Sequence, residues 1–137
     1  MLLVKTKIGP SKIHNIGLFA DEFIPKGTII WKFAPDFDLK FTEDEIKALP
    51  EITQYTIRWY RYICTHCGLS ILCSDDARFY NCSENPNTTG IELDGTEGEG
   101  GDITVRDIQV GEELTYNCKG PKEGDADWLW KLSDKKQ

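Results

Sequence analysis

The sequence has 137 residues, of which 39% are hydrophobic and 11% aromatic. This composition predicts one folded domain with one core. No apolar run approaches the roughly 20 residues that a membrane-spanning helix needs, and the run Met1–Val4 meets charge too soon to be a signal peptide. The net charge of −7 and the pI of about 4.8 disfavour direct nucleic-acid binding, because such proteins are usually basic. We therefore expect a cytoplasmic protein that binds neither membrane nor nucleic acid directly.

The chain contains five cysteines, an odd number. In a reducing compartment we expect them to be mostly buried small hydrophobic residues. Cys64 and Cys67 form a C-x-x-C, which is half of a four-ligand zinc site. Cys73 and His66 are the nearby residues that would complete it, in cramped geometry, and Gly68 favours a hairpin turn over the helix start of a redox motif. The sequence predicts no metal site, and a small zinc or redox protein is the alternative that it supports least.

Short strands dominate the predicted structure, which makes the fold mainly β. A helix is expected from Thr42, because Thr42 and Glu45 have the spacing of a capping box, and it should end before Pro50. The strands, which are rich in β-branched and aromatic residues or bounded by turn residues, are expected at residues 4–8, 18–20, 28–33, 62–64, 69–73, 88–93, 103–105 and 113–116. The segment 94–101 is rich in Gly and Glu and is expected to be a mobile surface loop.

A second helix is expected from Glu51 to about Trp59. In it Ile52, Tyr55 and Trp59 fall on one face. An aromatic stripe of this kind favours packing into the core over a ligand-binding role, so the sequence predicts that this face is buried.

Four blocks of the sequence gain meaning from their order and spacing. They are Ile16–Ala20 (IGLFA), Ile24–Thr28 (IPKGT), Ala77–Asn87 (ARFYNCSENPN) and Arg106–Thr115 (RDIQVGEELT). The blocks resemble the motifs G-x-G-L-F-A, I-P-K-G-E/T, A-R-F-x-N-H-S-x-x-P-N and R-D-I-x-x-G-E-E-L-T of the SET-domain family of lysine methyltransferases. The third and fourth blocks are specific, and the resemblance covers about residues 5–118.

The resemblance implies a β-rich fold of several small sheets with a short helical insert, of the compact bacterial type. It also implies a knot-like crossing of the Asn81 loop with the segment after Leu114, an exception to the usual absence of threading. We expect residues 1–137 to form a single SET domain, in which residues 119–137 are a C-terminal flanking segment.

The resemblance further implies that the chain binds S-adenosylmethionine and releases S-adenosylhomocysteine. Backbone groups near Gly17 would contact the cofactor, and the side-chain amide of Asn81 would hold it. The expected cofactor-binding residues are Asn15, Ile16, Gly17, Leu18, Arg78, Asn81, Cys82 and Trp128. Trp128 or Trp130 would cover the adenine, and ordinary core packing is the alternative for both tryptophans.

Three positions depart from the family pattern. Asn15 replaces the first glycine of G-x-G, a mild change because asparagine tolerates left-handed backbone. Cys82 replaces the histidine of N-H-S, where the family uses chiefly the backbone. Cys118 stands where the family ending E-L-T-x-D-Y has its catalytic tyrosine, and Tyr116 matches the position that limits how many methyl groups a lysine accepts.

The third departure affects the chemistry that the resemblance implies. Methyl transfer requires a neutral, aligned lysine, so positioning supplies much of the acceleration, and a thiol donates hydrogen bonds more poorly than a phenol. With Tyr116 and Cys118 as the catalytic positions, we expect a weak protein-lysine N-methyltransferase that acts on a lysine-containing protein or peptide. The alternative is a catalytically inactive SET-fold module that binds the cofactor, a peptide or both.

Overall fold

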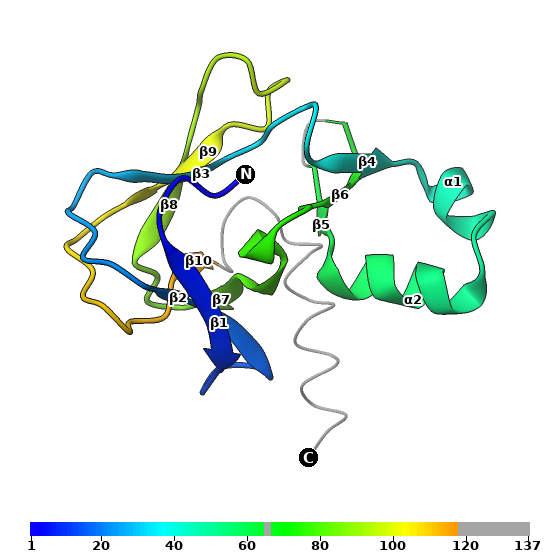
Figure 1. The fold of residues 1–137 in the computed structure, drawn as a ribbon. Coiled ribbons are helices and arrows are strands. Elements are labelled where there is room, and N and C mark those ends of the chain that lie inside the picture. Colours follow the sequence, from blue (N-terminus) through cyan, green and yellow to red (C-terminus); the bar gives the residue numbers. More distant parts are fainter. Residues whose placement is uncertain (65–66, 118–137) are drawn as a thin grey trace.

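The computed structural model describes residues 1–64 and 67–117, and the described part is mostly β (Figure 1). Its elements, in chain order, are β1 (Thr6–Pro10), β2 (Ile16–Ala20), β3 (Ile29–Lys32), β4 (Leu39–Phe41), α1 (Glu43–Lys47), α2 (Glu51–Tyr60), β5 (Tyr62–Ile63), β6 (Ser70–Leu72), the 3₁₀ helix η1 (Asp76–Phe79), β7 (Asn81–Ser83), β8 (Thr88–Ile91), β9 (Gly101–Thr104) and β10 (Thr115–Asn117). Each strand expected from the sequence has a counterpart, although β1 begins at Thr6 rather than Val4. None of the described helices is long and apolar enough to cross a membrane.

The strands form several small sheets rather than one large one. β1 and β2 make an antiparallel pair, β3-β9-β8 and β4-β6-β5 are three-stranded antiparallel sheets, and β10 pairs with β7 in parallel. This arrangement confirms the β-rich fold of small sheets with a short helical insert. The insert, α1 and α2 with the β4-β6-β5 sheet, lies to one side of the other sheets (Figure 1).

Two hydrophobic clusters hold these units together. The larger cluster contains buried residues of β2, β3, β6, η1 and the segments that connect the strands: Leu18, Ala20, Ile24, Ile30, Trp31, Phe33, Cys64, Ile71, Cys73, Ala77, Ile108 and Leu114. The smaller cluster joins Ile46 of α1, Ile57 of α2 and Leu72 of β6. The insert therefore has its own small core, which fixes α2 against the hairpin that follows it.

The helical insert begins as the sequence predicts. The Thr42 hydroxyl accepts from the Glu45 N–H at 3.1 Å, and the Glu45 carboxylate accepts from the Thr42 N–H at 2.7 Å, so the capping box is complete. The expected burial of one α2 face is wrong. Ile52 is 73% exposed and Tyr55 is 60% exposed, because α2 uses Ile57 for its core contact and turns its aromatic face outward.

The parallel pairing of β10 with β7 is the long-range contact on which the expected crossing depends. Thr115 pairs with Asn81, and Tyr116 pairs with Cys82. The buried Asn87 side chain joins the same region, since its carbonyl accepts from the Thr115 N–H at 2.9 Å and its amide donates to the Glu113 carbonyl at 2.8 Å. The segment after residue 117, which would complete the crossing, lies outside the described residues.

Candidate functional site

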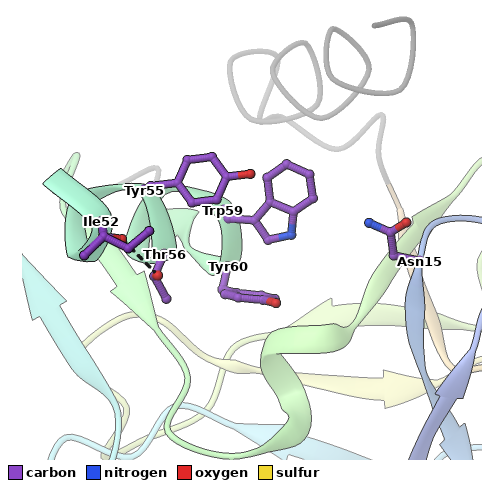
Figure 2. A pocket seen from close by; sticks show the side chains of 6 residues that line it. All are labelled: Asn15, Ile52, Tyr55, Thr56, Trp59 and Tyr60. Atoms are coloured by element: carbon purple, nitrogen blue, oxygen red, sulfur yellow. Dashed lines mark hydrogen bonds between the residues drawn. The ribbon is translucent and has the colours of Figure 1, made fainter. Parts of the chain in front are cut away.

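A pocket of about 380 Å³ lies between α2 and the residue that precedes β2 (Figure 2). We call it the α2 pocket, and its lining residues are Asn15, Ile52, Tyr55, Thr56, Trp59 and Tyr60. The α2 residues follow helical spacing and so lie on one helix face. Asn15 comes from the opposite wall (Figure 2). The volume is within the range of small-molecule sites, roughly 300–1,000 Å³.

Aromatic rings form most of the α2 side of this pocket. The rings of Tyr55 and Trp59 stack with centroids 5.9 Å apart and an angle of 24°. Trp59 also contacts His14, with ring centroids 5.5 Å apart, which links the helix to the loop before β2. Flat, partly exposed rings of this kind offer faces on which an aromatic ligand can stack. The exposed stripe that the sequence assigned to the core is therefore a wall of the pocket.

The opposite wall begins at the first block of the sequence motif. Asn15 has φ +37°, the left-handed backbone expected at this position. Gly17 has no room for a side chain, because a Cβ there would overlap the Glu113 carboxylate. The carbonyl of Ile16 accepts from the Asn81 amide at 3.0 Å, and that of Leu18 accepts from the Leu114 N–H at 2.8 Å. The backbone from Ile16 to Leu18 is thus held in place by Asn81 of the third sequence block and Leu114 of the fourth.

The Asn81 side chain joins three segments of the chain. Its amide nitrogen lies within hydrogen-bond distance of four acceptors: Glu113 Oε1 at 2.9 Å, the Ile16 carbonyl at 3.0 Å, and Ser11 Oγ and the His14 carbonyl, each at 3.2 Å. Ser11 Oγ in turn donates to the Glu113 carboxylate, at 2.8 Å to Oε1. The Asn81 amide therefore holds the loop before β2 in position. Its expected role in binding the cofactor stays a prediction.

Arg78 and Cys82 also have partners inside the fold. The Arg78 guanidinium donates to the Cys73 carbonyl at 2.9 Å and 3.2 Å, and it lies 6.0 Å from the Tyr60 ring, which lines the α2 pocket. Cys82 is disulfide-bonded. The expectation that the cysteines are mostly buried thiols is confirmed for Cys64 and Cys73 but is wrong for Cys82 and for Cys67, which is exposed.

Tyr116 is the one expected catalytic residue that the structure describes. Its ring lies 5.2 Å from that of Tyr80, between centroids. The Tyr80 hydroxyl is hydrogen-bonded to Thr88 Oγ1, and burial, aided by the charge of Asp102, raises the pKa of Tyr80 well above its ordinary value. Tyr80 is therefore a neutral phenol beside the expected catalytic strand.

Sequence reasoning missed Tyr80 as well as the aromatic wall. Tyr80 occupies the variable position of A-R-F-x-N, directly before Asn81, so an aromatic residue in that place was the available signal. Two expected site residues, Cys118 and Trp128, lie outside the described residues.

Comparisons with known proteins agree with this architecture. The family model described as "SET domain" matches residues 15–119. A solved structure from Plasmodium falciparum, described as a candidate histone methyltransferase, is similar over 85% of this chain and 94% of that chain, with a TM-score of 0.58 and 20% sequence identity. At that identity the likeness shows the fold alone. A search of curated proteins finds no matching sequence. The family match covers most of the chain and includes both the Asn15–Leu18 and Asn81 segments, so the chain belongs to the SET-domain family.

Proposed function

We propose that this chain is an S-adenosylmethionine-dependent protein-lysine N-methyltransferase with weak activity. The observation that carries the proposal is the α2 pocket, which lies against the Asn15 motif of a SET scaffold and has an aromatic wall. The cofactor would supply an activated methyl group on its sulfonium. Single-domain organisation over residues 1–137 and a cytoplasmic location are parts of the same proposal.

The residues around the pocket suit the cofactor's chemistry. Its adenine is a flat aromatic group that suits stacking on Tyr55 or Trp59. Its amino-acid end is charged and needs polar partners, which the backbone from Asn15 to Leu18 would supply. Because the Asn81 amide is already shared among internal acceptors, we propose that Asn81 acts mainly by holding that backbone in position.

Transfer to lysine would require a neutral amine that is aligned with the methyl group. We propose that Tyr116 faces the incoming amine and that Cys118 occupies the place of the family's catalytic tyrosine. Tyr80 packs on the Tyr116 ring and would restrict its rotation. Without a phenol at residue 118, orientation of the amine is less complete, which is the reason that we expect slow turnover.

The second candidate function is a catalytically inactive SET-fold module that binds the cofactor or a lysine-containing peptide. The observation that favours it is that Cys118 replaces the family's catalytic tyrosine. Cys82, which pairs with Tyr116 across the strands, is disulfide-bonded. Disulfides are rare in the cytosol, so each assay should be run with and without a reductant.

An assay with methyl-labelled cofactor and an array of lysine-containing peptides separates the two functions. The matched controls are the same peptides with arginine in place of lysine. We expect slow label transfer to lysine peptides only, with release of S-adenosylhomocysteine. Cofactor binding without transfer to any lysine, in both redox conditions, would support the inactive module and contradict the enzyme.

A further inference from the structure

Three potential metal ligands meet away from the α2 pocket. A sulfur atom from each of Cys64 and Cys67 and a carboxylate oxygen of Glu99 all lie within 4.8 Å of one another. The cysteines flank the turn between β5 and β6, and Glu99 comes from the loop between β8 and β9. The cluster therefore joins the insert to the loop between β8 and β9 of the β3-β9-β8 sheet.

The turn that carries the two cysteines is closed by backbone hydrogen bonds. The Cys67 N–H donates to Cys64 Sγ at 3.2 Å, and the Gly68 N–H donates to the Cys64 carbonyl at 2.9 Å. Gly68 has φ +70°, which glycine adopts without strain. An N–H directed at a sulfur stabilises the thiolate, the form in which cysteine binds a metal. The local fold thus favours metal ligation at Cys64.

Glu99 is held in place by its own loop and by a tyrosine. The buried Thr96 accepts two hydrogen bonds from this loop. Its backbone carbonyl accepts from the Glu99 N–H at 3.0 Å, and its hydroxyl accepts from the Gly100 N–H at 2.8 Å. The Tyr62 hydroxyl donates to Glu99 Oε1 at 3.2 Å. Metal-binding carboxylates are commonly oriented by such an outer hydrogen bond.

The loop that supplies Glu99 carries a second carboxylate outside the cluster. That carboxylate is Glu97, and it forms an ion pair with the Lys40 ammonium at 3.0 Å. Because Glu97 is not part of the cluster, it is the neighbouring carboxylate against which Glu99 can be compared.

We infer that Cys64, Cys67 and Glu99 bind a zinc ion that ties the β5–β6 hairpin to the β8–β9 loop. Soft thiolates with one carboxylate suit zinc better than magnesium or calcium. In a tetrahedral site with Zn–S of about 2.3 Å and Zn–O of about 2.0–2.2 Å, ligand atoms lie roughly 3.3–3.8 Å apart. A contraction of at most about 1–1.5 Å from the present separations, which are within 4.8 Å, would bring the three atoms to that spacing. The fourth position would go to a ligand outside this cluster.

This inference revises the expectation from the sequence. That expectation rested on missing ligands near the C-x-x-C, with Cys73 and His66 as the candidates. Cys73 is a buried thiol whose pKa is raised to about 12, first by burial, and it is not part of the cluster. His66 lies outside the described residues. Glu99 supplies the third ligand from a distant loop. The inference does not depend on the proposed enzymatic function.

The test measures zinc in the full chain, purified with reductant and zinc and then dialysed. We expect about one zinc per chain by elemental analysis, and almost none in Cys64→Ser and Cys67→Ser. Glu99→Gln should weaken zinc affinity at least about tenfold in competition with a chromophoric chelator. The matched control is Glu97→Gln, which changes the same loop outside the cluster and should keep the affinity of the unmodified protein. Binding should weaken at lower pH, because the two thiols must lose their protons.

Cobalt substitution of the unmodified protein keeps the test decisive if the cysteine variants fail to fold. A thiolate-to-cobalt charge-transfer band, lost on addition of zinc, would support the inference. So would a melting temperature that rises with zinc in the unmodified protein and in Glu97→Gln, but less in Glu99→Gln. Absence of the band, stoichiometric zinc in the Cys64→Ser/Cys67→Ser double variant, or equal affinity for Glu99→Gln and the unmodified protein would each overturn it.

Discussion

The carboxylate of Glu113 occupies the space that a side chain on Gly17 would need. That carboxylate is fixed by the Ser11 hydroxyl at 2.8 Å and by the Asn81 amide at 2.9 Å. Gly17 of the first sequence block and Asn81 of the third therefore both contact the carboxylate of Glu113, which belongs to the fourth. Because Asn15 lines the α2 pocket, this contact positions one wall of the candidate site.

Gly17→Ala should therefore damage the fold as well as the site. The new methyl group would displace the Glu113 carboxylate from its hydrogen bonds, at a cost of about 1–3 kcal/mol in the free energy of unfolding. Gly9 is the matched control, since it pairs with Gly17 across the β1–β2 ladder and a Cβ there meets only Phe19 carbons at 3.7 Å or more. Chemical denaturation of both variants checks this. Equal stability losses would show that Glu113 is not the cause.

Asn81→Ala should lower both stability and cofactor affinity. The half-buried Glu113 carboxylate and the Ile16 carbonyl would each lose a donor, which we expect to cost about 1–3 kcal/mol in stability. Since the same bonds position the backbone beside the pocket, cofactor binding should weaken by a similar free energy at a temperature where the variant is folded. Calorimetry together with a thermal melt measures both. A folded variant with unchanged cofactor affinity would contradict the role given to Asn81.

Tyr55→Ala should weaken cofactor binding with little effect on stability. Tyr55 is 60% exposed and lines the α2 pocket, so its ring contributes little to the core. Loss of one stacking face, roughly 0.5–1.5 kcal/mol, should reduce affinity about two- to tenfold. Val110→Ala is the control, because Val110 is equally exposed and does not line the pocket. If both variants bind alike, the pocket assignment is wrong.

Local signals in the sequence predicted the secondary structure well. The capping box at Thr42 and Glu45 fixed the start of α1, since both hydrogen bonds form between neighbours in the chain. Helical spacing also identified the face of α2 that carries Ile52 and Tyr55. It did not show what that face meets, because burial depends on segments distant in sequence.

Long-range contacts account for the features that the sequence did not predict. Glu99 approaches Cys64 and Cys67 only because the β8–β9 loop folds over the insert, and no local pattern predicts that approach. The family resemblance implied that the segment after Leu114 crosses the Asn81 loop, but the parallel pairing of β10 with β7 was not predicted, since strand patterns alone do not specify partners.

Cys118→Tyr should raise the rate of methyl transfer to lysine peptides while leaving cofactor affinity nearly unchanged. A phenol at this position would restore an orienting hydroxyl, and positioning effects of this kind are worth about a hundredfold or more in rate. Tyrosine is larger than cysteine, so overpacking could cost about 1–3 kcal/mol, and thermal melts must accompany the assay. The unmodified protein should be assayed with and without reductant, because Cys82 is disulfide-bonded in it.

A well-folded Cys118→Tyr variant that binds the cofactor but is no faster would count against this explanation of weak activity. High activity in the unmodified chain would also count against it. In that case Tyr116, braced by Tyr80, would be the group that orients the amine.

Calorimetric titration of the full chain with S-adenosylmethionine tests the central claim most directly, because both proposed functions of the SET scaffold can include this cofactor and the enzyme requires it. The titration should be run with and without reductant, with S-adenosylhomocysteine as a second ligand and adenosine as a control for the adenine alone. We expect saturable binding of one cofactor per chain, weakened in Tyr55→Ala and Asn81→Ala. A folded protein that shows no binding of S-adenosylmethionine in either redox condition would contradict the proposed methyltransferase function.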